Sequence, residues 1–499
     1  MPRFFSLDQR DIQSMGVQRN SIYNIVGQVL PLGLSLVTLP LYLDAIGLER
    51  FGVVAIGWLL LGYFGMFDLG LGRAVTHRIA ELQDAEADAR LEAFHTALAA
   101  NLVIGVAVGA LLWAFAELFF SYALKIDKSL LPELEWAGLL LGLMVPVASL
   151  TGVMTGALQG RELFKLVNIV SVLSTFLFQI FPLGIAWLVT TNTSAVLGAG
   201  IAARIIAFLA LWVLCAKEFE STMRVRFDRG QMALLLKFGG WVFLTALIAP
   251  LLTIADRFAI GAVLGASAVT YFTVPLQIIQ RLAIVPTAIS SALFPRLSAT
   301  KGSREFTRLG SQALATTIPL MTLAVVPVLL ISELGIELWL GANFAQASAT
   351  VAKILLVGIW FNALALIPFT MIQASGRPQT VSMILLCEVP FYLAILYFGL
   401  SQFGLIGCAI AFLIRSAADF FLLTAFAGRE VLPIRETLIG GVLLVAGAAI
   451  ALLVPSGSVL YWVISGFFVS LVVSNAVISL PAGWRARALK SINGTRSNI

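Results

Sequence analysis

The stretch MTGALQGRELFKLVNIVSVLS at residues 154–174 has a counterpart in MIQASGRPQTVSMILLCEV at residues 371–389. Each contains the end of an apolar run, a short turn with a Gly-Arg pair, and the start of another apolar run. The two turns are Gly160-Arg161 and Gly376-Arg377. A pattern that recurs in both halves of a chain indicates that the protein consists of two similar halves.

The composition is that of a membrane protein. The 499 residues are 60% hydrophobic and only 12% charged, and the mean hydropathy is +0.97. Soluble proteins contain about 25% charged residues, so a soluble domain of this size is excluded. Apolar runs of about 20 residues predict transmembrane helices. The short connections between the runs leave no room for a soluble catalytic domain. We therefore predict an all-α integral membrane protein.

Hydropathy predicts about fourteen transmembrane helices. Their ranges are 20–43, 51–72, 94–120, 136–158, 166–190, 195–216, 234–261, 268–291, 310–332, 350–373, 379–400, 404–426, 437–454 and 458–480. Helices 1–6 form an N-lobe at 20–216, helices 7–12 form a pseudo-symmetric C-lobe at 234–426, and helices 13–14 form an appended peripheral pair at 437–480. The other segments are a cytoplasmic N-terminal segment (1–19), a cytoplasmic linker (217–233) and a basic cytoplasmic tail (481–499). Because each lobe contains an even number of helices, the two lobes share one orientation.

The positions of the basic residues give the orientation in the membrane. With a cytoplasmic N-terminus, most of the 32 lysines and arginines fall in cytoplasmic segments, and the opposite loops hold only Arg50, Lys125 and Lys128. This asymmetry follows the positive-inside rule and predicts that both termini are cytoplasmic. The basic loops also explain the sequence pI of about 9.3, so we expect no nucleic-acid partner.

The sequence contains no pattern typical of an enzyme. The two histidines, His77 and His95, flank one predicted cytoplasmic loop, and there is no metal-ligand spacing or phosphate-binding glycine loop. No cofactor or metal is expected. Any work that the protein performs would therefore draw on an ion gradient, of H⁺ or Na⁺, or on the gradient of a substrate.

Five basic residues lie inside predicted helices: Arg204, Arg257, Arg281, Lys353 and Arg415. A cation at membrane depth costs about 2.5–3.5 kcal/mol, so such residues usually have a function. Arg281 is the strongest candidate, because Thr273 and Gln277 precede it at four-residue spacing and Gln280 adjoins it. We expect this polar stripe to face a water-filled cavity.

The other four cations have competing interpretations. Arg415 precedes Asp419 by one helical turn, which allows a salt bridge as readily as substrate binding. Arg204 has no obvious local partner, which favours a functional or interhelical role. Arg257 and Lys353 lie near the predicted outer ends of their helices, where the side chains could reach water instead.

Polar residues of two further kinds lie at predicted membrane depth. Asp256, Glu388 and Asp419 could couple transport to an ion, although we slightly favour a role as counter-charges for the arginines. Asn24 and Gln28 give helix 1 a polar face that could bind sugar hydroxyls or neighbouring helices. Prolines cluster in helices 1, 7 and 8, which predicts moving parts or static kinks.

Four stretches resemble one known family. DRFAIGAVLGASAVTYFTVPLQIIQRLAIVPTAISSALFPRLS (256–298) resembles the central segment of polysaccharide-transport and Wzx-type O-antigen flippases of the multidrug/oligosaccharidyl-lipid/polysaccharide (MOP) superfamily. LPLYLDAIGLERFGVVAIGWLLLGYFGMFDLGLGRAVTHRIAE (39–81) resembles that family's first two helices. LQGRELFKLVNI (158–169) and ASGRPQTVS (374–382) resemble its turns after helices 4 and 10. The similarity covers roughly residues 15–430.

The resemblance implies a V-shaped pair of lobes with alternating access. It implies transport of an undecaprenyl-pyrophosphate-linked oligosaccharide, an O-antigen or exopolysaccharide repeat unit, across the bacterial inner membrane. Helices 1, 2, 7 and 8 would line a cationic cavity, with Arg281 and Arg257 in it and Asp256 in a cation site. Membrane lipids, a glycan polymerase and a chain-length regulator are the expected partners.

The residues also bear on three other functions. A multidrug exporter of the same superfamily is the main alternative, but it would need an acidic cavity, and most of the deep charges here are basic. A membrane glycan polymerase or ligase would need a long periplasmic loop, which the sequence lacks. An ungated scaffold or lipid scramblase stays open.

Overall fold

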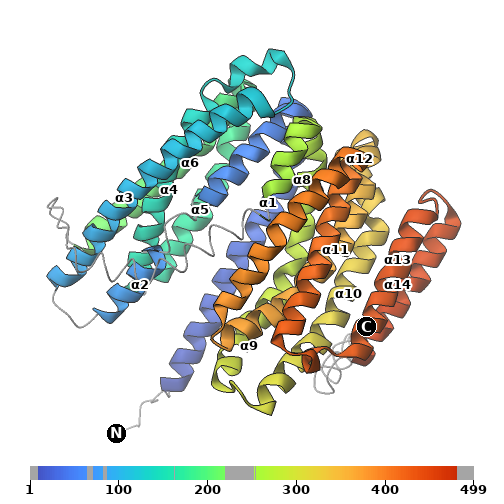
Figure 1. The fold of residues 1–499 in the computed structure, drawn as a ribbon. Coiled ribbons are helices and arrows are strands. Elements are labelled where there is room, and N and C mark those ends of the chain that lie inside the picture. The colour runs from blue at the N-terminus through green and yellow to red at the C-terminus, as the bar shows by residue number, and fades with distance from the viewer. Residues whose placement is uncertain are drawn as a thin grey trace, which may run out of the picture. The chain divides into compact units, whose positions relative to one another are not determined.

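The computed structural model describes residues 9–64, 71–82, 87–161, 163–219, 252 and 254–479 (Figure 1). The chain divides into two compact units. The first comprises residues 1–250 with 265–267, and the second comprises 251–264 with 268–499. All regular structure in the described ranges is helical.

The described residues of the first unit form six α-helices and two short helical turns. They are α1 (Gln9–Phe64), α2 (Leu71–Glu81), α3 (Ala87–Leu118), η1 (Phe119–Ala123), η2 (Lys128–Leu134), α4 (Ala137–Gly160), α5 (Phe164–Leu188) and α6 (Thr193–Glu218). A kink at Gly47, where φ is 77°, divides α1. Only glycine adopts this conformation readily, so it separates the predicted helix at 20–43 from the start of the one at 51–72. The helix itself begins at Gln9, well before residue 20.

The second unit begins with a helical stretch at 254–263. It continues with α8 (Ala266–Ile279), η3 (Gln280–Ala283), α9 (Ile284–Ala299), α10 (Arg304–Leu340), α11 (Ala342–Ala374), α12 (Pro378–Ala427), η4 (Arg429–Val431), α13 (Ile434–Leu453) and α14 (Val459–Ser479). A kink at Gly404, where φ is 59°, divides α12 into the predicted helices at 379–400 and 404–426. Glycines therefore join consecutive spans in both units without an intervening loop.

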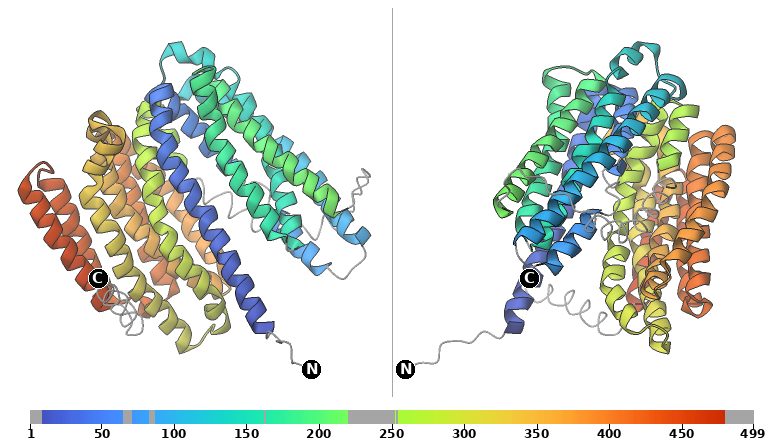
Figure 2. Two further views of the ribbon diagram at one scale, coloured as in Figure 1. Left: turned by 180° about the vertical axis from the view of Figure 1, so that it is seen from behind. Right: turned by 60° about the vertical axis from the view of Figure 1, so that its left-hand side comes forward.

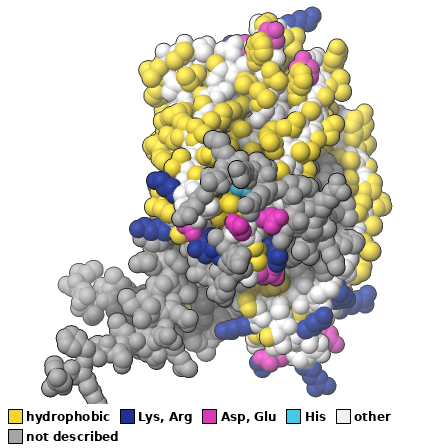
Figure 3. Space-filling model, turned by 90° about the vertical axis from the view of Figure 1, so that its left-hand side faces the viewer, with side chains coloured by type: hydrophobic (Ala, Val, Ile, Leu, Met, Phe, Trp, Pro, Cys, Tyr) yellow, Lys and Arg dark blue, Asp and Glu magenta, His cyan; other side chains and the backbone are white. Residues whose placement is uncertain are grey.

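Helix length and hydropathy identify a multi-pass membrane protein. Ten helices of the described ranges are long and apolar enough to cross a membrane. Large apolar side chains such as Val103 and Leu111 of α3 are exposed, as expected for lipid-facing positions. Figure 3 shows a face whose upper part is covered by hydrophobic side chains, with lysines and arginines gathered below. The count of fourteen stays a prediction, because the spans at 51–72 and 234–261 extend outside the described residues.

The Gly-Arg turns perform the same task in both halves. Arg161 Nε lies 2.8 Å from Glu218 Oε1, at the end of α6. Arg377 Nη2 donates a 3.4 Å hydrogen bond to the Phe426 carbonyl oxygen, at the end of α12. Each arginine thus ties its turn to the end of the last helix in its half. The repeat that the two stretches indicated is present in these contacts.

The appended pair, α13 and α14, packs on α10 through small residues (Figure 2). A Cβ atom at Gly440 would lie 2.6 Å from Ile318 Cγ2, and one at Gly447 would lie 3.1 Å from Val326 Cγ1. Lys353 of α11 fastens the opposite end of α13, because its Nζ lies 2.6 Å from Glu333 Oε2 and donates to the Ala451 carbonyl oxygen at 2.8 Å. The predicted lobe boundaries stay predictions, because most of the linker at 217–233 and the tail at 481–499 lie outside the described residues.

Candidate functional site

Arg281 lies at a break in a membrane-spanning helix. The predicted helix at 268–291 is not continuous, because a 3-10 turn at Gln280–Ala283 separates α8 from α9. Pro286 follows this turn and has no N–H to donate to the carbonyl four residues earlier, which accounts for the change in helical geometry. A 3-10 turn inside a longer helix often marks a functional position. Arg281 stands within it.

The Arg281 side chain is exposed, and within the described chain it forms no hydrogen bond or ion pair. Gln277 and Gln280 are exposed beside it, followed by Thr287 one turn and a half further on. The predicted stripe is wrong at its first residue: Thr273 is buried. The neighbouring side chains of Phe272 and Val274 are also fully buried. The polar face therefore begins at Gln277.

Asp256 and Arg257 form a buried ion pair between neighbouring residues. Their exposed fractions are 1% and 4%. Asp256 Oδ1 accepts hydrogen bonds from the backbone N–H of Arg257 at 2.8 Å and from its Nη1 at 2.7 Å. The guanidinium also lies 5.9 Å from the centre of the Phe272 ring. Arg257 neither reaches water nor presents a free positive charge, so the geometry does not favour it as a cavity cation.

Glu388 and Arg415 lie on the two segments of α12 and face a common cavity. Their exposed fractions are 7% and 8%, and both border a cavity of about 220 Å³. Tyr392 also lines it, and exposed apolar side chains such as Phe391 and Ile414 lie around it. Asp419 is buried one turn beyond Arg415, and both carboxylates interact electrostatically with the Arg415 guanidinium.

The salt bridge that the spacing of Arg415 and Asp419 allows is not formed within the described chain. The Arg415 guanidinium instead lies 5.2 Å from the centre of the Tyr392 ring and 5.7 Å from that of Phe412. Both Glu388 carboxylate oxygens and Asp419 Oδ1 are buried and accept no hydrogen bond from the described residues. Two carboxylates thus share one guanidinium without direct contact. When all three are ionised, one negative charge is left over.

The remaining predicted residues lie elsewhere. Arg204 is half-buried in α6, with its guanidinium 4.6 Å from the centre of the Phe178 ring of α5. Lys353 is buried and paired with Glu333, so it does not extend to water as considered above. Asn24 and Gln28 lie on α1, but their side chains are outside those described.

Sequence reasoning missed three aromatic or acidic partners. Tyr392 follows Glu388 at four-residue spacing in an otherwise apolar run, a signal that could have placed it beside the carboxylate. Phe178 and Glu333 gave no such signal, because each contacts its partner from a different helix.

Comparison with known proteins relates this arrangement to transporters. The family model described as "Polysaccharide biosynthesis protein" matches residues 17–301. A Shigella flexneri protein named "Putative O-antigen transporter" is 33% identical over 413 residues, which cover 82% of this chain and 97% of that protein.

Two solved structures have the same fold. The lipid II flippase MurJ, in an inward closed conformation, matches with a TM-score of 0.69 and 15% identity, over 92% of this chain and 97% of its own. An inward-facing multidrug resistance MATE family transporter of the MOP superfamily matches with a TM-score of 0.64 and 16% identity, over 82% and 98%. These findings confirm the predicted fold class. The relative and both solved structures carry the names of transporters or flippases rather than of enzymes.

Proposed function

Because the chain belongs to the polysaccharide biosynthesis protein family and has the MOP superfamily fold, we propose that it is a flippase for lipid-linked oligosaccharide. Its substrate is an undecaprenyl-pyrophosphate-linked repeat unit of O-antigen or exopolysaccharide. The protein moves this unit across the bacterial inner membrane by alternating access, with both termini in the cytoplasm. A polymerase and a chain-length regulator then act on the product.

One observation carries this proposal: Arg281 is exposed and unpaired among the described residues, on the polar face of a membrane-spanning helix. A lipid-facing guanidinium would be costly, so a polar face at this depth is expected to line a wet cavity. The planar N–H donors of the Arg281 guanidinium can bind two phosphate oxygens at once, and the group stays charged at every physiological pH. Gln277 and Gln280 add neutral donors and acceptors beside it for sugar hydroxyls.

The other cations are assigned weaker roles in substrate binding. Arg257 is neutralised by Asp256. Arg415 is buried near two carboxylates, and Arg204 lies against an aromatic ring. We therefore assign the first pyrophosphate contact to Arg281 and leave Arg204 as a second contact. Asn24 and Gln28 of α1 remain proposed sugar contacts.

Ion coupling is assigned to Glu388 and Asp419. Together with Arg415 they carry one unbalanced negative charge when ionised, and one H⁺ or Na⁺ would neutralise it. Asp256 is already paired with Arg257, so we assign it a structural role rather than ion binding. Tyr392 lines the same cavity as Glu388, and its hydroxyl neither donates nor accepts a hydrogen bond among the described residues.

The multidrug-exporter alternative fits these positions less well. A cavity for cationic drugs needs exposed acidic residues, whereas Asp256, Glu388 and Asp419 are buried. The exposed charges from α8 to the end of α9 are two arginines, Arg281 and Arg296. Identifying the transported substrate would decide between a flippase and a multidrug exporter.

The test replaces Arg281 in cells that depend on this protein for surface polysaccharide. Arg281→Ala should abolish surface polysaccharide and leave lipid-linked repeat units accumulating, while Arg281→Lys, which keeps the charge but not the planar fork, should retain part of the export. Arg296→Gln is the matched control, because Arg296 is an exposed arginine at the far end of α9. Normal surface polysaccharide from Arg281→Ala at normal protein level would refute the assignment.

A further inference from the structure

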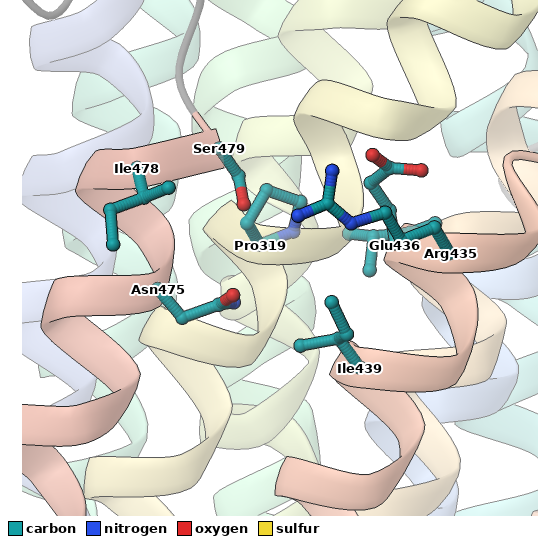
Figure 4. A pocket seen from close by; sticks show the side chains of 8 residues that line it. Pro319, Arg435, Glu436, Ile439, Asn475, Ile478 and Ser479 are labelled. Carbon is teal, nitrogen blue, oxygen red and sulfur yellow. The ribbon is translucent and has the colours of Figure 1, made fainter.

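A cavity of about 190 Å³ lies where α13 and α14 meet α10 (Figure 4). Its lining includes Pro319 of α10, Arg435 and Glu436 of α13, and Asn475 and Ser479 of α14. In Figure 4 the Arg435 side chain extends from α13 across Pro319 towards Ser479. The cavity lies in the second unit alone, apart from the Glu388–Arg415 cavity and from Arg281.

Two opposite charges border this cavity without neutralising each other. Arg435 and Glu436 are consecutive residues in the first turn of α13. Within the described chain, neither forms an ion pair or a hydrogen bond. A ligand in this cavity therefore meets one guanidinium and one carboxylate, each with free bonding capacity.

This charge pattern selects the class of ligand. A simple phosphate would gain Arg435 but would be repelled by Glu436, and a simple amine would meet the reverse problem. A group that joins a phosphate to an ammonium through a short chain satisfies both residues. Asn475 and Ser479 can donate further hydrogen bonds to the phosphate oxygens.

The surroundings indicate that the ligand is a lipid. Ile439 and Ile478 border the cavity, and Leu438 and Val442 continue an exposed apolar surface along α13. Such a surface on a membrane-spanning helix is covered by acyl chains. Arg429 and Arg435 also place this end of the helices on the predicted cytoplasmic side, where pockets between helices hold lipid headgroups.

We propose that this cavity binds the headgroup of a phosphatidylethanolamine-type lipid. The phosphate bonds to Arg435, Asn475 and Ser479, the ammonium bonds to Glu436, and the acyl chains lie along α13. The bound lipid joins the appended pair to α10 at this end. At the other end, Lys353 of α11 makes the connection, because it bonds both Glu333 of α10 and the Ala451 carbonyl oxygen of α13. This site is independent of the proposed flippase activity.

The test is native mass spectrometry of the full-length protein, delipidated in detergent and titrated with dioleoyl-phosphatidylethanolamine. Arg435→Gln and Glu436→Gln should each weaken binding about tenfold, the equivalent of one charge-assisted hydrogen bond. The chain supplies a matched control in Arg429-Glu430, the same dipeptide on an exposed turn outside the cavity. Arg429→Gln and Glu430→Gln should leave binding unchanged.

Three results would overturn the proposal, each in a different way. Equal binding of dioleoyl-phosphatidylglycerol, with no loss in Glu436→Gln, would make the cavity a general anionic-lipid site. Equal binding of glycerophosphoethanolamine, which has the headgroup without acyl chains, would make it a site for a soluble ligand. Unchanged binding in both cavity variants would remove the headgroup from the cavity altogether.

Discussion

The two halves place a cation in the same way and differ in what surrounds it. Arg204 of α6 lies over Phe178 of α5, and Arg415 of the second segment of α12 lies over Tyr392 of the first. In the N-terminal half, no acidic residue occurs in the spans of α5 and α6 before Glu218 at the end. In the C-terminal half, Glu388 and Asp419 are buried near the arginine.

This difference distinguishes contacts that belong to the repeated fold from residues that have a separate function. A contact that recurs in both halves, such as the cation over an aromatic ring or the Gly-Arg turn, is explained by the repeated fold. Among the described residues of these paired helices, carboxylates lie near the arginine in the C-terminal half only, and the contact of the cation with the ring forms without them in the other half. Their presence is better explained by a task such as ion coupling.

The largest expected effect tests the buried pair of the C-terminal half. Asp256→Asn removes the carboxylate charge that lies 2.7 Å from Arg257 Nη1, and breaking this buried ion pair should destabilise the protein by about 4 kcal/mol. The double variant Asp256→Asn/Arg257→Gln removes both charges and should recover most of this loss. Chemical unfolding in one detergent measures both, and equal losses in the single and double variants would contradict the pairing.

The next effect compares the two arginines directly. Arg415→Leu leaves Glu388 and Asp419 buried without a cation and should cost about 3 kcal/mol. Arg204→Leu removes a cation that lies only over an aromatic ring and should cost about 1 kcal/mol or less. The same unfolding assay checks this, and equal costs would mean that the halves do not differ in the proposed way.

The smallest effect concerns the turns that both halves share. Arg161→Gln and Arg377→Gln should each cost about 0.5 kcal/mol, because both arginines are partly or fully exposed and such contacts contribute little. The two costs should also match within error. A large cost in only one variant would show that the turns are not equivalent.

The sequence predicted features that depend on residues close together in the chain better than contacts between residues far apart in it. Hydropathy and the repeated turns predicted the helical membrane fold, because both are properties of consecutive residues. The exposure of Arg281 beside Gln277 was also predicted, because helical periodicity places them on one face. The kinks at Gly47 and Gly404 join predicted helices end to end, and a single glycine gave no sign of that.

The errors concern contacts between helices. Thr273 shares the periodicity of Arg281, but the packing around α8 buries it. Lys353 pairs with Glu333 on another helix, which spacing along one helix cannot reveal. Arg415 and Asp419 have the spacing of a salt bridge, yet the arginine lies against Tyr392 and Phe412 instead. The four-residue spacing allows an ion pair, but the side-chain rotamer that Arg415 adopts depends on the residues packed around it.

The central claim is that Arg281 binds the pyrophosphate of the lipid carrier. The most direct measurement is the affinity of the purified protein for undecaprenyl pyrophosphate without its glycan, in wild type, Arg281→Gln and Arg296→Gln. Loss of charge-assisted hydrogen bonds predicts binding about ten- to a hundredfold weaker in Arg281→Gln and unchanged in Arg296→Gln. Equal affinity in all three proteins would contradict the claim.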